Sequence, residues 1–395
     1  MKKYILIGTI LFSVLISTVN PAYGEEKDTE DGINETLDLA PDAKSAILIE
    51  RDTGKLLFEK NAHKKLPPAS MTKIMTLLLI MEELDKGKLN LDETIRISEN
   101  ASSMGGSQIF LGAGEEMSVN DLLKGIAIAS GNDASVALAE RISGSEKAFV
   151  KKMNDKVNEL KLENTHFQNA SGLPADDHYS TSYDMAIIAK ELLKYETITD
   201  YTSIYEDYLR KGEKNEFWLV NTNKLVRFYP GVDGLKTGFT NEAKYCLTAT
   251  AKKNDMRVIT VVMGVNTVKE RNATTSKMLD YAFNHFETEK LYEKGQTITS
   301  LELLKAETKK VNIVASESIS TIHKKGESTE NISTSIVLDD QFNLPLKKGD
   351  QTGKLIVKNE EKVLSEIPLV LDQDVQKASY ITLFKRTVQS LVKND

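Results

Sequence analysis

The sequence predicts an α+β catalytic region, then a small all-β domain and a C-terminal amphipathic helix. Three observations support this prediction: apolar runs with helical spacing in the first half of the chain, two adjacent strand-like runs, and short alternating segments near the C-terminus. The two strand-like runs, Tyr245–Ala251 and Met256–Val265, are typical of an antiparallel meander. The chain has 395 residues, which is enough for two domains.

The N-terminus is typical of a signal peptide over residues 1–24. Lys2 and Lys3 precede the apolar run Tyr4–Ile16, and Ala22-Tyr23-Gly24 forms a small-x-small cleavage site. The alternative is an uncleaved anchor, for which the apolar run is short. We therefore expect an exported protein whose mature chain begins with a polar linker over residues 25–38.

The segment Ser70-Met71-Thr72-Lys73 follows two prolines and precedes an apolar run, so a helix is expected to begin at or beside Ser70. Positions i and i+3 share a helix face, which would place the Lys73 amine beside the Ser70 hydroxyl. A lysine whose pKa is lowered by burial or by a neighbouring cation can activate a serine nucleophile. By itself the S-x-x-K pattern also fits a helix start with a serine cap.

A second motif, Ser130-Gly131-Asn132, follows the apolar run Gly125–Ala129 and opens a helical pattern. It is expected in a tight connection between two buried helices, where it can line a cleft. The alternative is an ordinary helix N-cap. Another S-x-N pattern, Ser98-Glu99-Asn100, runs into polar residues and is interpreted as a loop.

A third motif, Lys236-Thr237-Gly238, lies just before the predicted meander. In a strand, Lys236 and Gly238 point to the same face. The cation of Lys236 and the hydroxyl of Thr237 suit a substrate carboxylate, and the missing side chain of Gly238 would let a substrate backbone approach. The alternative is a turn between two strands.

The three motifs, in this order, resemble those of the low-molecular-mass penicillin-binding proteins, specifically the serine D-alanyl-D-alanine carboxypeptidases. The likeness includes Asn164-Thr165-His166-Phe167 and Pro230–Gly234, and it covers roughly residues 39–395. It is nearest to the sporulation-associated enzymes of endospore-forming bacteria. The resemblance implies a penicillin-binding/β-lactamase-like transpeptidase domain over residues 39–288, with an antiparallel sheet and helices.

The resemblance also implies the reaction. Ser70 would attack the carbonyl between the two terminal D-alanines of a peptidoglycan stem peptide, with Lys73 as its base. Ser130 would relay a proton to the leaving D-alanine. β-Lactams would inhibit covalently, cross-linking would be limited, and no cofactor or metal would be needed.

The resemblance implies two further sets of groups. The substrate would be bound by Asn132, Lys236, Thr237, Gly238 and Arg271. The oxyanion hole would consist of the backbone N–H groups of Ser70 and Phe239. Phe239 replaces the histidine that some relatives carry, which leaves a backbone role intact. Arg271 has an alternative interpretation as a solvated charge.

The C-terminal part reads as a small β domain over residues 289–372 and a helix over residues 373–395. An apolar stripe with helical spacing and positive charge around it are typical of an interfacial helix, which the resemblance would place on the outer face of the cytoplasmic membrane. The alternative is a helix packed on the β domain. The stripe is Tyr380, Ile381, Phe384, Val388, Leu391 and Val392, and the cations are Lys377, Lys385, Arg386 and Lys393.

Other functions are less well supported by the sequence. A β-lactamase would need an E-x-x-L-N pattern, which Glu159–Glu163 fails at its last position. A silent membrane scaffold is disfavoured because all three motifs are intact. A zinc peptidase is disfavoured because H-E-x-x-H is absent from the sequence, and Asp176-Asp177-His178 is interpreted as a solvated loop. The net charge of −7 argues against a nucleic-acid partner, and Cys246 is expected in the core.

Overall fold

The computed structural model describes residues 37–392, except residues 330 and 340. The predicted signal peptide and most of the predicted linker lie outside the described residues. The chain divides into two units, Met1–Asp38 and Leu39–Asp395, and the second contains every helix and strand described here.

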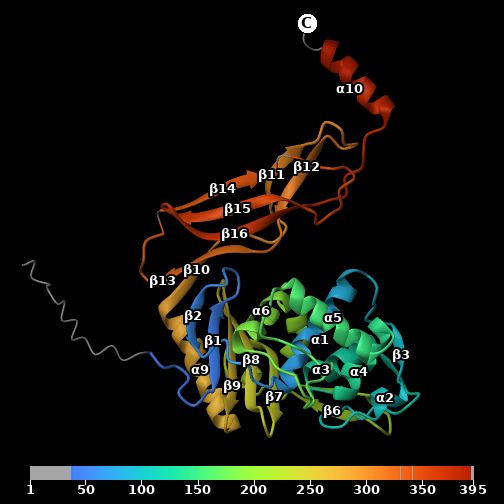
Figure 1. Cartoon of the computed structure of the whole chain (residues 1–395), viewed down its shortest axis with the longest axis vertical. Coiled ribbons are helices and arrows are strands. Elements are labelled where there is room, and N and C mark those ends of the chain that lie inside the picture. The colour runs from blue at the N-terminus through green and yellow to red at the C-terminus, as the bar shows by residue number, and fades with distance from the viewer. Residues whose placement is uncertain (1–36, 330, 340, 393–395) are drawn as a thin grey trace, which may run out of the picture. The chain divides into compact units, whose positions relative to one another are not determined.

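A five-stranded antiparallel sheet, in the order β2-β1-β9-β8-β7, forms the centre of the catalytic region (Figure 1). The strand β7 lies at one edge of this sheet, so one of its sides is not paired with another strand of the sheet. The predicted meander is therefore confirmed as β8 and β9, which follow β7 directly. The bounds are β1 Ser45–Glu50, β2 Leu56–Lys60, β7 Val232–Thr240, β8 Lys244–Lys253 and β9 Met256–Val265.

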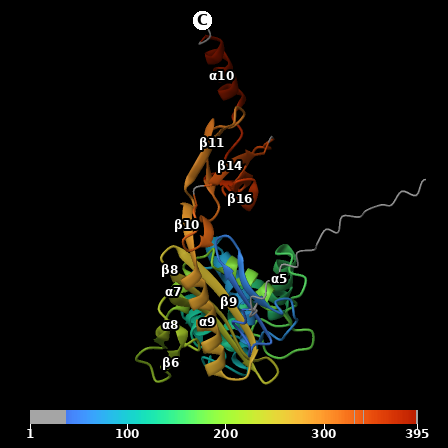
Figure 2. The ribbon, with the colours of Figure 1, turned by 90° about the vertical axis from the view of Figure 1, so that its left-hand side faces the viewer.

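Alternate residues along a strand point to opposite faces of the sheet, and in β1 and β9 residues of both faces are buried. In β1, Ile47 and Ile49 belong to one hydrophobic cluster, and Ala46 and Leu48 belong to another on the opposite face. The helix α9 (Val268–His285) packs on β8 and β9 (Figure 2), while α6 (Ser182–Leu192) packs on β1 and β9. Apolar side chains thus hold helices on both faces of the sheet.

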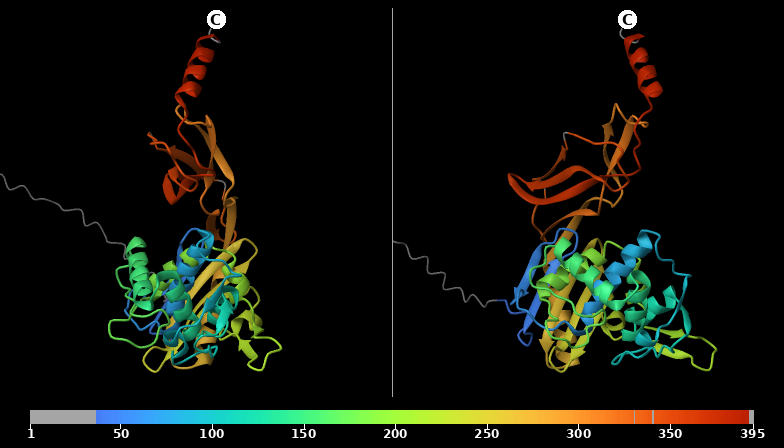
Figure 3. Two further views of the ribbon diagram at one scale, coloured as in Figure 1. Left: turned by 90° about the vertical axis from the view of Figure 1, so that its right-hand side faces the viewer. Right: turned by 45° about the vertical axis from the view of Figure 1, so that its right-hand side comes forward.

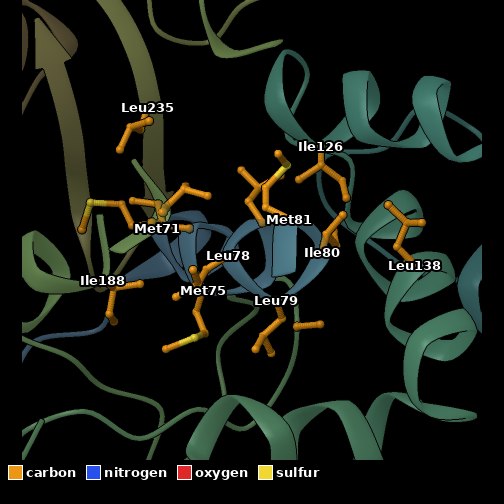
Figure 4. Packing of buried hydrophobic residues seen from close by; sticks show 14 of the residues in the cluster. Met71, Met75, Leu78, Leu79, Ile80, Met81, Ile126, Leu138, Ile188 and Leu235 are labelled. Atoms are coloured by element: carbon orange, nitrogen blue, oxygen red, sulfur yellow. The ribbon is translucent and has the colours of Figure 1, made fainter. Parts of the chain in front are cut away.

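The helical part lies on the face of the sheet that α6 covers. Around α1 (Lys73–Asp85), the largely apolar helix that follows Ser70, the side chains of Met71, Met75, Leu78 and Leu235 pack together with those of neighbouring elements (Figure 4). The remaining elements of the catalytic region are α2 Glu99–Ser102, α3 Val119–Ala127, α4 Asn132–Ser143, α5 Glu146–Glu159, α7 Ile198–Thr202, α8 Leu225–Phe228, and the pairs β3 Thr94–Arg96 with β4 Glu116–Ser118 and β5 Glu206–Leu209 with β6 Phe217–Val220.

Two of these elements bear on the sequence predictions. The segment Ser98–Asn100, interpreted as a loop, instead begins α2, because the Ser98 hydroxyl accepts a hydrogen bond from the Ala101 backbone N–H and caps the helix. The helix α5 ends at Glu159, within the segment that fails the E-x-x-L-N pattern. Cys246 is fully buried in β8, as expected.

The C-terminal part is all-β, as predicted (the orange to red strands of Figure 3). A five-stranded antiparallel sheet has the order β11-β12-β16-β15-β14, and β10 pairs with β13. The predicted boundary at residues 288/289 falls inside β10. The bounds are β10 Phe286–Tyr292, β11 Thr297–Glu302, β12 Lys310–Ala315, β13 Ile319–Lys324, β14 Ile332–Leu338, β15 Gln351–Asn359 and β16 Lys362–Leu371.

The last helix, α10 (Tyr380–Val392), begins later than the predicted start at residue 373. Val375 is buried and exchanges backbone hydrogen bonds with Leu346, so the residues just before the helix belong to the packing of the β domain. Within the described residues, no helix combines the length and apolar character that crossing a bilayer requires.

Candidate active site

Ser70 lies on a short 3-10 helix, η1 (Ala69–Thr72), that leads directly into α1. This confirms a helix start beside Ser70. Met71 is fully buried and anchors the turn in the core, which leaves Ser70 half-buried on the other side. Ala69 has a φ of 48°, a left-handed value that is uncommon for a residue other than glycine. Packing on both sides therefore fixes an unusual turn beneath the serine.

Lys73 is fully buried, and its amine contacts three groups. Nζ lies 2.6 Å from Asn132 Oδ1, 2.6 Å from the Ser171 carbonyl oxygen and 3.2 Å from Ser70 Oγ. Burial lowers the pKa of Lys73 well below its ordinary value, the charge of Lys236 lowers it further, and Asp133 acts in the opposite direction. A neutral amine has two hydrogens for the two carbonyl-type acceptors, which leaves its lone pair for the Ser70 hydroxyl.

Ser130 lies in the tight connection between α3 and α4, as predicted. Its φ is 66°, and its hydroxyl is buried without a hydrogen-bond partner among the described residues. Both features cost free energy, and such costs are concentrated at functional sites. The side chain of Asn132 is held at both ends, because its Oδ1 accepts from Lys73 and its Nδ2 donates to the Gly105 carbonyl at 2.6 Å.

The residue after this motif, Asp133, was not identified by the sequence analysis. It is buried, and its carboxylate accepts hydrogen bonds from the backbone N–H groups of Ile109 and Leu111 at 3.0 and 3.1 Å. It thereby fixes the loop that also supplies the Gly105 carbonyl to Asn132. A helix-start aspartate was readable from the sequence, but its partners in a remote loop were not.

Lys236 and Arg271 form a buried pair of positive groups. Lys236 lies on β7 and is 1% exposed, and Arg271 lies on α9 and is 4% exposed. The interpretation of Arg271 as a solvated charge is therefore wrong. In the described part of the chain, neither side chain forms an ion pair with a carboxylate; Lys236 Nζ contacts the Thr237 carbonyl oxygen at 3.2 Å, and Arg271 donates to Asn272 Oδ1.

The pKa values of this pair follow from their burial. Desolvation, followed by the charge of Arg271, lowers the pKa of Lys236 to about 7. Desolvation also lowers the pKa of Arg271 to about 10. Two buried cations without a carboxylate partner among the described residues form a strong site for an external anion.

The rest of the third motif lies on β7 at the sheet edge. Thr237 Oγ1 bonds to Thr222 Oγ1 at 2.8 Å, and the half-exposed Phe239 ring packs on Tyr245 with centroids 4.4 Å apart. Gly238 was expected to leave room for the backbone of a substrate, and this reason is wrong. An added Cβ would lie 2.8 Å from the Pro68 carbonyl oxygen, so the protein's own nucleophile turn occupies that space.

The loop at residues 170–178 completes the surroundings of Ser70, and the sequence analysis gave it no role. Besides the Ser171 carbonyl, it contributes His178, whose imidazole is buried and bonded to Thr72. The interpretation of His178 as part of a solvated loop is therefore wrong. Among the described residues, no group of three or more His, Cys, Asp or Glu side chains could hold a metal ion.

Comparisons with known proteins agree with this geometry. The family model described as Peptidase S11, D-alanyl-D-alanine carboxypeptidase, matches residues 33–267, and that described as Penicillin-binding protein 5, C-terminal domain, matches residues 286–377. The sequence is 54% identical over 388 residues to D-alanyl-D-alanine carboxypeptidase DacF of Bacillus subtilis, covering 98% of this chain and 99% of DacF. It is 33% identical over 346 residues to DacA of Escherichia coli, covering 86% of this chain and 85% of DacA.

Solved structures show the same fold. Penicillin binding protein 5 from Haemophilus influenzae has a TM-score of 0.66 at 33% identity, with 85% of this chain and 98% of that chain covered. The ampicillin-bound form of Penicillin-Binding Protein D2 from Listeria monocytogenes has a TM-score of 0.56 at 32% identity, with 61% of this chain and 98% of that chain covered.

Proposed function

This chain belongs to the D-alanyl-D-alanine carboxypeptidase family, and we propose that it removes the terminal D-alanine of peptidoglycan stem pentapeptides through an acyl-enzyme on Ser70. The observation that carries the proposal is the buried Lys73 amine, 3.2 Å from Ser70 Oγ. Both hydrogens of its neutral form have acceptors, so the lone pair is directed to the serine.

In the first step, Ser70 Oγ attacks the carbonyl carbon between the two D-alanines while its proton moves to Lys73. The negative charge that develops on the carbonyl oxygen is held by the backbone N–H groups of Ser70 and Phe239. Collapse of the tetrahedral intermediate breaks the peptide bond, and Ser130 relays a proton to the departing amine. Its hydroxyl supports this role, because it has no hydrogen-bond partner in the described part of the chain.

In the second step, water attacks the acyl-enzyme, which regenerates Ser70 and releases a stem peptide shortened by one D-alanine. Because this removes the terminal D-alanine that cross-linking requires, the activity limits cross-linking. The reaction uses side chains, backbone groups and water, with no cofactor in any step.

The terminal carboxylate of the substrate binds Lys236, Thr237 and Arg271. The burial of both cations without a carboxylate partner in the described chain supports this assignment. Asn132, held between Lys73 and Gly105, keeps the amine in place and lies where a substrate amide would bind. Gly238 contributes by letting β7 approach the nucleophile turn.

We further propose that the protein is exported and acts outside the cytoplasm, attached to the outer face of the membrane by α10. The apolar stripe of this helix supports attachment, because Tyr380, Ile381 and Phe384 are 93%, 69% and 71% exposed. Arg386 contributes differently from the other cations: it donates to the carbonyl oxygens of Leu304, Ala306 and Glu307 and so ties the helix to the β domain.

Two finer assignments complete the proposal. The domains are a signal peptide at 1–24, a linker at 25–38, a catalytic domain at 39–288, a β domain at 289–372 and a terminal segment at 373–395 that contains α10. We also propose a role in sporulation, which the resemblance of the motifs to the sporulation-associated carboxypeptidases implies.

The experiment that tests the reaction locates the residue modified by penicillin. We expect mass spectrometry to find the penicilloyl group on Ser70, and we expect Ser70→Ala to lose both labelling and hydrolysis of a D-Ala-D-Ala peptide. The exposed Ser103→Ala serves as the matched control and should retain both. Labelling of Ser70→Ala would overturn the assignment, and rapid turnover of nitrocefin would instead indicate a β-lactamase.

A further inference from the structure

The imidazole of His178 is buried beside the nucleophile turn, with a relative exposure of 7%. Its Nδ1 lies 3.1 Å from the backbone nitrogen of Gln168, and its Nε2 lies 2.8 Å from Thr72 Oγ1. The ring of Phe167 packs against it edge to face, with centroids 5.8 Å apart. Both ring nitrogens are therefore occupied within the protein.

These contacts determine the protonation state of the ring. The Gln168 N–H can only donate, so Nδ1 must accept and carries no hydrogen. The single ring proton is then on Nε2, which donates to the Thr72 hydroxyl. Burial, with a smaller effect of His166, lowers the pKa of His178 to about 4, in agreement with a neutral ring near neutral pH.

The segment Thr72–Thr76, which lies just after Ser70, makes three contacts with the loop at residues 170–178, and Thr72 makes one of them. The Thr76 hydroxyl donates to the Ala170 carbonyl at 2.7 Å, Lys73 Nζ donates to the Ser171 carbonyl at 2.6 Å, and Thr72 bonds to His178. A Cβ on Gly172 would collide with the Ala69 carbonyl, so the loop backbone touches the turn that carries Ser70. The loop thus sets the position of both Ser70 and Lys73.

We propose that His178 is a positioning residue for acylation: its Nε2–H fixes Thr72, and through Thr72 the turn that holds Ser70 against the Lys73 amine. The inference rests on the proposed function, because it concerns the rate at which Ser70 is acylated. His178 does not touch the reacting atoms, and its effect is on the distance and direction between Ser70 Oγ and Lys73 Nζ. Misplacement of a reacting group is costly in rate even when binding is intact.

Two pairs of variants separate this role from simple packing. His178→Gln can keep a donor near the place of Nε2, whereas His178→Asn can keep only the acceptor near Nδ1. Thr72→Ser keeps the hydroxyl, whereas Thr72→Val removes it at nearly constant volume. For each variant the measurements are the penicillin acylation rate constant at saturation, the dissociation constant of the initial complex, and the melting temperature.

We expect His178→Asn and Thr72→Val each to slow acylation about tenfold, the effect of losing roughly one hydrogen bond, with the initial dissociation constant unchanged. His178→Gln and Thr72→Ser should recover most of the rate. The double variant His178→Asn with Thr72→Val should be no slower than either single variant, because both remove the same contact.

Wild-type acylation in Thr72→Val would overturn the inference, and this outcome does not depend on the histidine variants being folded. Multiplying losses in the double variant, or equal losses in the Gln and Asn variants that follow the melting temperature, would also overturn it. A failure of the proposed function is distinct, since the wild-type protein would then show no penicillin adduct on Ser70.

Discussion

At the scale of single residues, the site depends on removing lysine amines from water. Lys73 and Lys236 are both buried. The charge of Lys236 lowers the pKa of Lys73, and the charge of Arg271 lowers the pKa of Lys236. A buried amine loses the hydration that stabilises its charged form, so its pKa falls. For Lys73 the result is a base, and for Lys236 it is a cation that an arriving carboxylate can stabilise. Burial lowers the pKa of both amines, and their different partners give the two side chains different chemistry.

The first prediction concerns Lys73. We expect Lys73→Ala to slow acylation by penicillin by about 100- to 10,000-fold, the range for loss of a general base, with little change in initial binding. Rapid-mixing measurements of labelling separate the two quantities. Lys88→Ala, at an exposed position just beyond the same helix, is the control. An acylation rate close to that of the wild type would remove Lys73 from the role of base.

The second prediction concerns the pH dependence of substrate capture. Because the pKa of Lys236 is lowered to about 7, its charge is present below that pH and is lost as the pH rises through it. We therefore expect kcat/KM for a peptide with a free carboxylate to fall on the alkaline side of about pH 7.

An amidated peptide provides the control for this pH profile, because it has no carboxylate for Lys236 to bind. The decline should be weaker with that peptide. Lys236→Arg, which keeps its charge at higher pH, should move the decline to higher pH. The same decline with both peptides would show that Lys236 does not bind the carboxylate.

The sequence predicted residues whose relation is local or belongs to a known pattern. Ser70 and Lys73 are close because i and i+3 share a helix face, which spacing alone reveals. The contacts of Lys73 with Ser171 and of Thr72 with His178 join residues far apart in the chain, so no spacing rule could find them. For the same reason, only the structure could reveal that Arg271 is buried.

At the scale of elements, the nucleophile turn is held between a loop and a strand that both approach it closely. Gly172 touches the turn from the loop side, and Gly238 touches it from β7. Gly172 also has a φ of 85°, which side-chain-bearing residues rarely adopt. Glycine at both positions allows backbone to pack on backbone around Ser70.

The third prediction tests this close packing. We expect Gly172→Ala to lower the free energy of unfolding by about 3 kcal/mol or more and to slow acylation, because its Cβ would collide with the Ala69 carbonyl. Gly144→Ala is the matched control. It also has a positive φ, 77°, but open space around an added Cβ, so a loss of about 1 kcal/mol and normal acylation are expected.

Denaturant unfolding and penicillin labelling would measure the two effects in each variant. Equal losses of stability in both would mean that the backbone conformation alone matters and that the contact with the turn does not. The contact partners of these glycines depend on the path of the loop across the turn, so the sequence did not reveal them.

Elements with a strong local signal were predictable, and those set by capping were less so. The meander β8–β9 follows from two adjacent strand-like runs, and α4 follows from its alanine-rich pattern. The short helix α2 was missed because one serine cap outweighs the polar composition of its segment. The predicted start of α10 was too early because Val375 is apolar. An apolar residue at this position fits the stripe of a helix as well as the core of the β domain.

At the scale of the whole molecule, the chemistry and the proposed membrane contact lie in different parts of the chain. The groups around Ser70 all come from residues before α10, which contributes no side chain to the site among its described contacts. The order of the catalytic region, the β domain and the last helix could be predicted from changes in the spacing of apolar residues along the sequence. Their mutual arrangement could not, because it depends on contacts that no local pattern encodes.

The last prediction concerns this separation. Deleting Tyr380–Asp395 from the mature protein should abolish binding to vesicles that contain anionic lipid and leave hydrolysis of a soluble peptide unchanged. The deletion starts at Tyr380 because Val375 and the residues around it pack in the β domain and must be kept. Exposed apolar area drives interfacial binding, so Phe384→Glu in the full-length protein should weaken sedimentation with vesicles strongly, while Lys385→Gln should weaken it slightly and make it less sensitive to salt. Sedimentation of the truncated protein equal to that of the full-length protein would show that α10 serves the β domain instead of the membrane.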